Sequence, residues 1–382
     1  MSQPRCHKLL LSAAAATRRP SSTAVAAAAV SSFATLPRFV STVTSPTATT
    51  TASRAPLTRQ QYQSYPPSHP HHHHHHHYRN LLTTLPRRRP ATARTMSTST
   101  TKLPSTLTGP PVAAYVAPGA CQLTSDPTPC RLVSRTAVSE TSSVLRFALP
   151  QAGLPLNLAT CACLLAQSSS IVPGDTTTRP YTPISTNANV GYFDLLVKNY
   201  GEQGLMSRHL HEIEIGSTDI SFFHIPFNVK LQAPEFKRYK QVLMLIGGTG
   251  VTPMIQALHE LLGNPANKDI KVTVLYGSRV ANDILGQELL DHWAQLHPDQ
   301  LTVHHVLSHE PDDSPWSGGR GYINRDWIAR LFPPTTQQDD GLGVWVCGPP
   351  PMYKALCGPR DEKEVTGVLA ELGFAAEQVY KY

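Results

Sequence analysis

Acidic residues are absent from the first hundred positions of this 382-residue chain, which hold twelve lysines and arginines ahead of the first acid, Asp126. The other positions hold 21 of the 33 basic residues and all 26 acids, a net charge of −5. The formal charge of +7 therefore resides in a basic leader joined to a mildly acidic body. This distribution excludes a wholly basic nucleic-acid-binding protein, because the positive charge lies outside the part that can fold.

Paired cysteines and long apolar runs are also absent. The seven cysteines are odd in number and none belongs to a CxxC pair, which argues against a zinc ribbon or a disulfide framework and favours a reducing compartment. No segment approaches the roughly 20 apolar residues that a membrane-spanning helix needs. About 280 residues follow the acid-free first hundred positions, which is enough for about two domains.

The leader, residues 1–117, has the composition of a targeting segment. Residues 1–40 are rich in arginine, serine and alanine, which is typical of an organelle transit peptide, and we expect a mitochondrial location. A plain disordered tail is the alternative, and translation from Met96 would give a cytosolic or endoplasmic-reticulum-associated protein. The run His71–His77 has no acidic or cysteine partner nearby, so we expect a solvated spacer and no metal site.

Residues 118–238 predict an all-β first domain. Short β-branched segments separated by turn residues indicate an antiparallel barrel or sandwich; they cover 130–138, 144–149, 161–166 and 192–198. Between the last two of these segments, residues 179–185 read RPYTPIS. The two prolines keep the backbone extended, so that the side chains between them project at fixed angles.

The residue types in this segment suit a flavin nucleotide or any similar ligand. The fork of Arg179 can bind a diphosphate, the ring of Tyr181 can cover an aromatic ring system, and the hydroxyl of Thr182 can reach a ring nitrogen. An ordinary proline-stiffened strand is the alternative. Further on, Gly204-Leu205-Met206-Ser207 predicts a glycine turn that enters a short helix, whose unpaired amides form an anion site or a simple helix cap.

Residues 239–382 predict alternating strands and helices, which favours a parallel sheet with helices on both faces. The expected strands cover 241–246, 272–276, 301–307 and 343–347, and the expected helices 253–262, 284–296 and 327–332. The first strand runs into GGTGVTP, a strand, glycine turn and helix order typical of dinucleotide binding, although it is not GxGxxG. Ligands bind at the carboxyl ends of such strands, so Cys347 is expected at the mouth of the crevice; a small buried thiol is the alternative.

Taken together, RPYTPIS, GLMS, GGTGVTP and CGPPPM resemble, in this order and spacing, the motifs of the ferredoxin–NADP reductase superfamily, and most closely those of its NADH–cytochrome b5 reductases. The resemblance covers roughly residues 118–382. It implies a six-stranded Greek-key FAD barrel at 118–238 and a parallel-sheet, Rossmann-like nicotinamide-nucleotide domain at 239–382. It also implies an oxidoreductase that passes hydride from NADH to FAD and single electrons to cytochrome b5 or a similar haem protein.

The same resemblance assigns site residues. On the flavin side it implies contacts from Arg179, Pro180, Tyr181, Thr182, Val197, Lys198, Tyr200, Gly204, Met206, Ser207 and, across the domain interface, Thr252. On the nucleotide side it implies contacts from Gly248, Thr249, Gly250, Asp283, Cys347, Gly348, Pro349 and Met352. Thr182, Lys198 and Cys347 are the residues expected next to the hydride transfer itself.

Charged side chains indicate which nicotinamide nucleotide and which kind of electron acceptor the protein uses. Asp283 occupies the position that the family uses to favour NADH, because a carboxylate accepts ribose hydroxyls and repels a 2′-phosphate; Ser278 and Arg279 act in the opposite direction. For an acidic acceptor we expect a basic patch of Lys230, Lys237, Arg238 and Lys240, with a solvated linker as the alternative. Peripheral membrane association and oligomeric state stay open.

Two other functions are compatible with the same residues. One is a related NAD(P)H flavin reductase that serves ferredoxin, a quinone or a nitrate-reducing partner, and the other is a non-catalytic flavin-binding module. The chain also departs from the family pattern: Leu205 replaces a basic residue, Tyr382 replaces a terminal phenylalanine, and the segment around Asn157 lacks a glycine. The residues 222–240 are expected to be an insertion. The histidines His209, His211 and His259 are expected at the surface.

Overall fold

The computed structural model describes residues 107, 109–226, 229–333 and 340–382, which all belong to one compact unit, residues 93–382. The predicted transit peptide, the run His71–His77 and Met96 lie outside the described residues. In the described ranges, no helix combines the length and the apolar character needed to cross a bilayer. The predicted domain limits stay predictions.

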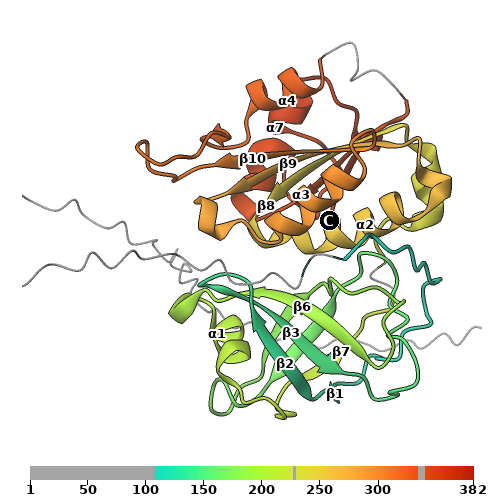
Figure 1. Ribbon diagram of the computed structural model, residues 1–382, viewed down its shortest axis with the longest axis vertical. Coiled ribbons are helices and arrows are strands. Elements are labelled where there is room, and N and C mark those ends of the chain that lie inside the picture. The colour runs from blue at the N-terminus through green and yellow to red at the C-terminus, as the bar shows by residue number, and fades with distance from the viewer. Residues whose placement is uncertain (1–106, 108, 227–228, 334–339) are drawn as a thin grey trace, which may run out of the picture. The chain divides into compact units, whose positions relative to one another are not determined.

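The first half of the described chain folds into two antiparallel sheets (Figure 1). One sheet has the strand order β2-β3-β6 and the other β1-β7-β4-β5. The strands are β1 (Thr128–Pro129), β2 (Leu132–Ala137), β3 (Ser142–Ala148), β4 (Leu164–Ser168), β5 (Thr177–Tyr181), β6 (Tyr192–Lys198) and β7 (Ser221–Phe223). The predicted antiparallel architecture is confirmed. Phe222, expected in an insertion, instead pairs with both Thr128 and Ala166 and so belongs to a sheet.

Three phenylalanines fasten these two sheets to each other. Phe147 and Phe193 come from the three-stranded sheet and Phe222 from the four-stranded one, and all three are fully buried. Their ring centroids lie 4.8 to 5.7 Å apart. Each such aromatic pair stabilises a fold by about 0.5–1.5 kcal/mol beyond the area it buries. The cluster therefore fixes the frame on which the motif residues stand.

The second half forms a six-stranded parallel sheet of order β11-β10-β9-β8-β12-β13, which confirms the predicted parallel architecture. Its strands are β8 (Gln241–Gly247), β9 (Lys271–Ser278), β10 (Leu301–Leu307), β11 (Gly319–Arg320), β12 (Leu342–Cys347) and β13 (Val379–Lys381). The α-helices are α1 (Leu205–Glu212), which belongs to the first half, α2 (Val251–Gly263), α3 (Gln287–Leu296), α4 (Arg325–Leu331), α6 (Pro350–Leu356) and α7 (Gly367–Glu371).

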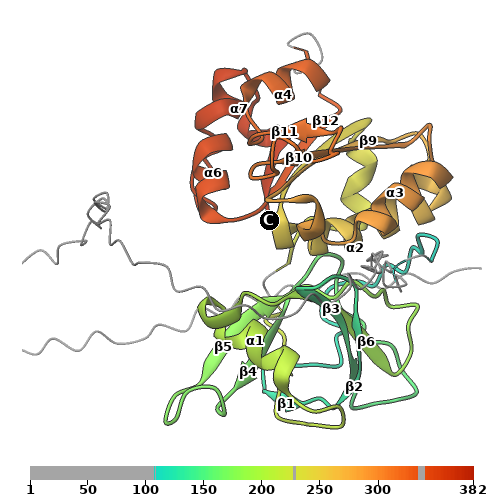
Figure 2. The same cartoon turned by 60° about the vertical axis from the view of Figure 1, so that its left-hand side comes forward.

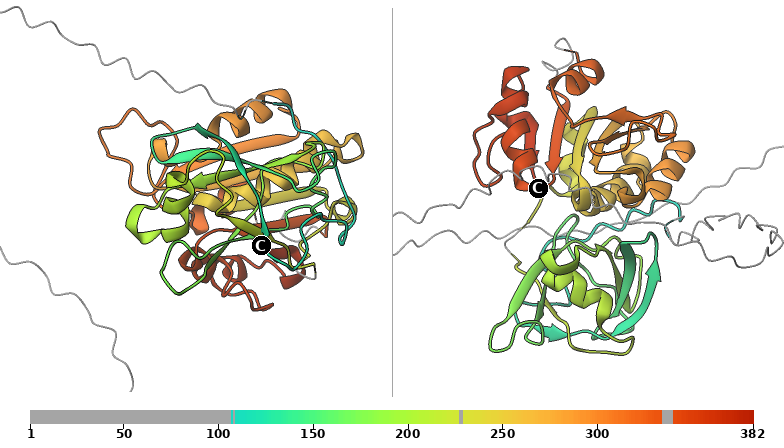
Figure 3. Two further views of the ribbon diagram at one scale, coloured as in Figure 1. Left: turned by 90° about the horizontal axis from the view of Figure 1, so that it is seen from below. Right: turned by 90° about the vertical axis from the view of Figure 1, so that its left-hand side faces the viewer.

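Helices cover both faces of this sheet, as Figures 2 and 3 show with the yellow and orange α2 and α3 on one side and the red α6 and α7 on the other. Along β8, Val242, Met244 and Ile246 pack with residues of α2 and α3. The alternate residues Leu243 and Leu245 pack with residues of α6 and α7. A strand buried on both faces has no polar side, which is why β8 appears in the sequence as an unbroken apolar run.

A segment ahead of the first strand, residues 109–114, runs over α2 and α3. The Trp293 indole donates a hydrogen bond to the Gly109 carbonyl at 2.8 Å, and the Val112 amide donates to Nδ1 of His259 at 3.0 Å. The His259 ring packs edge-on against Trp293, with centroids 4.7 Å apart. Burial lowers the pKa of His259 to about 4, so its imidazole is a neutral acceptor. The prediction of a surface histidine is wrong here, because this segment covers the ring.

The surface prediction is also wrong for the two histidines of α1, which are half-buried and hydrogen-bonded. His209 lies 2.5 Å from the carboxylate of Asp219, and Nδ1 of His211 donates to the Ser207 carbonyl at 2.7 Å. Short 3₁₀ turns complete the fold: η1 (Gly201–Gln203), η2 (Ala233–Arg238), η3 (Gly248–Gly250), η4 (Pro265–Asn267), η5 (Ala281–Asp283) and η6 (Ala376–Gln378).

Candidate active site

The RPYTPIS segment adopts the extended backbone that its prolines predict, and its first half forms β5. β5 is an edge strand, where a proline such as Pro180 costs no ladder hydrogen bond. Arg179 is exposed, and its guanidinium donates to the Thr178 carbonyl at 2.7 Å. Four of the five N–H donors of an arginine thus stay available to a ligand such as a diphosphate. Tyr181 is half-buried, and burial raises the pKa of its phenol.

A helix of the second half holds the other end of this segment. The Gln256 side-chain amide, on α2, donates to the carbonyls of Pro183 and Ser185 at 2.7 and 2.5 Å. Thr182 lies just before these anchored residues, half-buried, and within the described residues its hydroxyl has no hydrogen-bond partner. The sequence did not single out Gln256. A signal was present, since Gln256 lies one turn after Thr252 and is the one polar residue between Pro253 and Leu258.

The glycine turn before α1 is closely packed. A Cβ at Gly204 would lie 2.4 Å from the Ser207 hydroxyl and 2.6 Å from Cβ of Tyr200. Ser207, the third residue of α1, accepts from the Tyr200 amide at 3.2 Å and donates to the Gly204 carbonyl at 2.9 Å. The Ser207 hydroxyl, which the sequence predicts to bind a ligand, therefore stabilises the turn. The amides of Leu205, Met206 and Ser207 precede the first intrahelical bond, from Arg208 to Gly204, and stand ready for an anion.

Residues predicted for the flavin edge and for the nucleotide lie together at the ends of β6 and β9. The Lys198 ammonium is 2.6 Å from the carboxylate of Asp283, with less than a fifth of either side chain exposed. The Tyr200 hydroxyl reaches Thr249 at 3.5 Å, and the Lys198 ammonium lies 5.9 Å from the Tyr200 ring centre. Val197, the neighbour of Lys198 on β6, is fully buried and keeps the strand in place.

The GGTG turn brings the ends of β8 and β12 into backbone contact. A Cβ at Gly250 would lie 2.3 Å from the Cys347 carbonyl oxygen and 3.0 Å from the Gly348 nitrogen. Gly248 has φ +52°, in the region that favours glycine, and its carbonyl accepts from the Tyr276 hydroxyl at 3.0 Å. Thr252 is buried and donates to the Thr249 carbonyl at 3.3 Å.

The CGPPPM segment closes the same end of the sheet. Met352 and Pro349 pack against Gly247, where a Cβ would lie 2.6 Å from the methionine sulfur and 2.8 Å from the proline ring. Burial raises the pKa of Cys347 to about 11, so the thiol is protonated at neutral pH. A protonated thiol does not act as a nucleophile. If Cys347 acts in the reaction, it does so by packing against a ligand.

Glycine-lined strand ends, helix amides and an exposed arginine together fit a dinucleotide and a flavin. Two family models match the chain here: an oxidoreductase FAD-binding domain over residues 129–222 and an oxidoreductase NAD-binding domain over residues 244–358. NADH-cytochrome b5 reductase 2 of Scheffersomyces stipitis is 37% identical over 257 residues, 66% of this chain and 82% of that protein. This chain belongs to the NADH-cytochrome b5 reductase family.

Further relatives agree with this membership. The NADH-cytochrome b5 reductase 2 of Pyricularia oryzae is 36% identical over 251 residues, which are 64% of this chain and 72% of that protein. The cytochrome b5 reductase domain of Ulva prolifera nitrate reductase is a solved structure with 25% identity and a TM-score of 0.56, covering 71% of this chain and all of that one. The CS-b5R domains of human Ncb5or share the fold, with 22% identity, a TM-score of 0.56 and coverage of 67% and 69%.

Members of the NADH-cytochrome b5 reductase family are FAD-dependent oxidoreductases, so this chain is an FAD- and NADH-binding enzyme. The structure brings Lys198, Tyr200, Thr249 and Asp283 together by direct contacts. Arg179–Tyr181 lie on β5 with Thr182 directly after it, and Leu205–Ser207 begin α1 with Gly204 directly before it. The individual roles of the site residues stay predictions.

Proposed function

We propose that this chain transfers electrons from NADH through bound FAD to cytochrome b5 or a similar haem protein. The names of its relatives support this acceptor. The structural observation that carries the proposal is the 2.6 Å contact between Lys198 and Asp283, because it joins the strand end expected at the flavin to the turn expected at the nucleotide ribose. FAD, when bound, supplies the chemistry that accepts hydride and releases single electrons.

The work left to the protein is positioning. Arg179 and the first amides of α1 would hold the diphosphate, while Tyr181 and Thr182 would lie along the ring system. Gln256 fixes the backbone directly after Thr182, which restricts the position of this residue. Hydride transfer requires that the reacting atoms lie about 3–3.5 Å apart, and even a small displacement of these atoms lowers the reaction rate strongly.

The direct test uses the full chain with a panel of donors and acceptors. We expect a yellow protein whose colour bleaches on anaerobic addition of NADH, and faster reduction of cytochrome b5 than of ferredoxin or a quinone. A colourless protein, or one whose flavin does not bleach, would overturn the enzyme proposal. A coloured protein that prefers ferredoxin would overturn only the choice of acceptor.

An acidic acceptor would meet a local basic surface. Lys237, Arg238 and Lys240 are exposed at or just after η2, whereas Lys230 is half-buried and burial lowers the pKa of its ammonium. We propose the three exposed residues, here called the η2 basic surface, as the docking site. Such a surface raises association rates by electrostatic attraction, and that attraction weakens as salt is added.

Charge reversal tests the docking surface. For Lys237→Glu combined with Arg238→Glu, we expect kcat/KM for cytochrome b5 to fall roughly tenfold at low salt and its salt dependence to flatten. Reduction of ferricyanide, a small acceptor, should not change. The control pair Lys268→Glu and Lys363→Glu makes the same charge change on exposed residues elsewhere. An equal effect of the two pairs would refute a local docking site.

We also propose a mitochondrial location, supported by the acid-free, arginine-rich composition of residues 1–40. A fluorescent protein fused after residue 40 should enter mitochondria in the cell, and replacing the arginines of this segment by glutamine should stop the import. Full chain that starts at Met96 should stay outside. Cytosolic fluorescence of the first fusion would contradict the proposal.

A further inference from the structure

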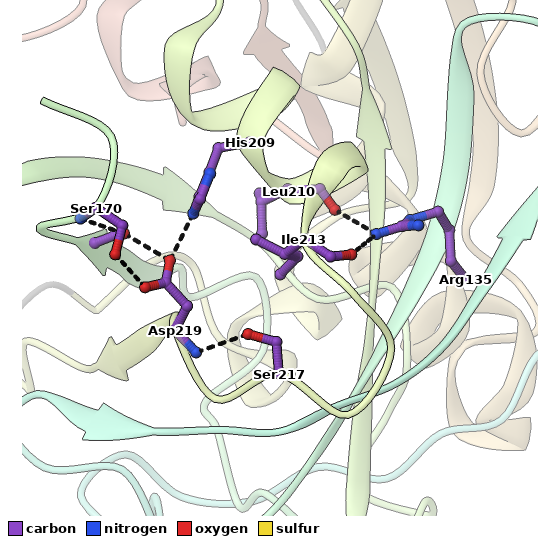
Figure 4. A network of polar contacts seen from close by, with 8 residues as sticks. Arg135, Ser170, His209, Leu210, Ile213, Ser217 and Asp219 are labelled. Carbon is purple, nitrogen blue, oxygen red and sulfur yellow. Dashed lines mark hydrogen bonds and ion pairs between the residues drawn. The ribbon is translucent and has the colours of Figure 1, made fainter.

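A single carboxylate, Asp219, holds the flank of α1. Nε2 of His209, in the middle of the helix, lies 2.5 Å from Oδ2 of Asp219 (Figure 4). The Ser168 hydroxyl donates to the same oxygen at 2.9 Å, and the Ser170 hydroxyl donates to Oδ1. The Asp219 amide in turn donates to the Ser217 hydroxyl at 3.2 Å. Asp219 therefore joins α1 to the end of β4, in the four-stranded sheet.

The carboxylate is in its charged form at neutral pH. Partial burial by itself would raise the pKa of Asp219, but hydrogen bonds from Ser170, His209 and Ser168 lower it below the usual value. Three donors on one carboxylate stabilise the charged form and restrict its orientation. About a quarter of the Asp219 side chain and a fifth of the His209 side chain are exposed. Water therefore competes only in part for the contact between these two side chains.

A second clamp acts on the other end of α1. The guanidinium of Arg135, on β2, donates to the carbonyls of Leu210, at 3.4 Å, and Ile213, as Figure 4 shows. These carbonyls belong to the last turn and the C-cap of α1, where no N–H donor is available within the helix, and a cation there also interacts favourably with the helix dipole. Because β2 belongs to the three-stranded sheet, α1 is tied to both sheets.

The arrangement is not that of a hydrolytic triad. In a serine–histidine–aspartate triad the imidazole lies between the hydroxyl and the carboxylate. Here the carboxylate lies in the centre and both serine hydroxyls bind it directly. The His209 ring contacts the carboxylate and neither of these hydroxyls, so the group is a structural clamp.

We propose that Asp219, acting through His209, is a positioning residue for FAD: it sets the place of α1 and thereby of the amides that receive the diphosphate. α1 has only eight residues, too few to be stable without tertiary contacts, so its clamps decide where its first turn lies. The inference rests on the proposed binding of FAD. It extends that proposal to residues that no motif of the sequence contains.

The test compares two ligands that differ at the diphosphate. FAD carries the diphosphate and an adenosine, whereas riboflavin offers the same ring system with neither. In full-chain protein freed of flavin, Asp219→Asn and His209→Gln should each raise the FAD dissociation constant roughly tenfold and change that of riboflavin less than twofold. The double variant should raise the FAD dissociation constant no more than the stronger single variant does, because both changes break the same contact.

Glu212→Gln is the matched control, since it breaks an exposed ion pair of 3.4 Å with Arg208 on the same helix and should leave both constants unchanged. Parallel loss of FAD and riboflavin affinity, or no loss of either, would overturn the positioning role. If Asp219→Asn does not fold, His209→Gln alone decides. Wild-type protein that binds neither flavin would instead refute the proposed function, which keeps the two failures distinct.

Discussion

Replacing Gly250 by alanine is expected to slow the reduction of the flavin by NADH about a hundredfold or more while FAD stays bound. The added Cβ would lie 2.3 Å from the oxygen and 2.6 Å from the carbon of the Cys347 carbonyl. Both are backbone atoms, so relief requires that the ends of β8 and β12 move apart. Overpacking of this kind costs about 1–3 kcal/mol of stability, and a displacement of about 1 Å at a reacting site costs about a hundredfold in rate.

The measurement for Gly250→Ala is the anaerobic rate of flavin bleaching by NADH, with the FAD content of the same sample. We expect the rate to fall about a hundredfold or more at unchanged FAD content. Gly153→Ala is the control, because nothing lies within 4 Å of the position of its Cβ. A Gly250→Ala enzyme with normal bleaching would show that this strand end does not receive the nicotinamide.

Replacing Asp283 by alanine is expected to change the choice of nucleotide. A hydrogen bond to a charged group contributes about 1.5–3 kcal/mol, so loss of the ribose contact should lower kcat/KM for NADH by about tenfold or more. The ammonium of Lys198, now 2.6 Å from that carboxylate, would lose its partner and attract a 2′-phosphate. The ratio of NADH to NADPH efficiency should therefore fall by about a hundredfold.

Steady-state kinetics with both nucleotides measure this ratio. The double variant Asp283→Ala with Lys198→Met should lose the gain for NADPH, since no unpaired ammonium is left there. Asp291→Asn is the control, because that carboxylate pairs with His305, at 3.2 Å, in a different part of the sheet. An unchanged ratio in Asp283→Ala would mean that nucleotide choice depends on other residues, with Arg279 the first candidate.

Local pattern predicted the regular elements closely. β6 and β10 begin and end where the apolar segments 192–198 and 301–307 do, because a buried strand needs an apolar run and a turn on either side. The observed limits of an element differ from the predicted ones where a residue adopts a special backbone conformation. The helix expected from residue 284 starts at 287, since Gly286 before it has φ +66° and cannot continue a helix.

One departure from the family pattern was resolved by conformation. The segment around Asn157 lacks a glycine that is part of the family pattern. Asn157 has φ +55°, in the left-handed region that asparagine tolerates better than most residues. The terminal Tyr382 is likewise accommodated: it is 3% exposed and packs 4.8 Å from Tyr380 and 6.1 Å from Trp345, between ring centres.

The sequence by itself determined the class of enzyme, its cofactors, the order of its motifs along the chain and the two kinds of sheet in its fold. Periodicity, glycine turns and proline act over a few residues, so they can be recognised locally. Only the tertiary structure decided which side chains meet, such as Lys198 with Asp283, Asp219 with His209, and Gln256 with carbonyls more than seventy positions away. These pairings depend on how distant strands align and on burial that strengthens charge contacts, and neither is encoded in a short stretch of sequence.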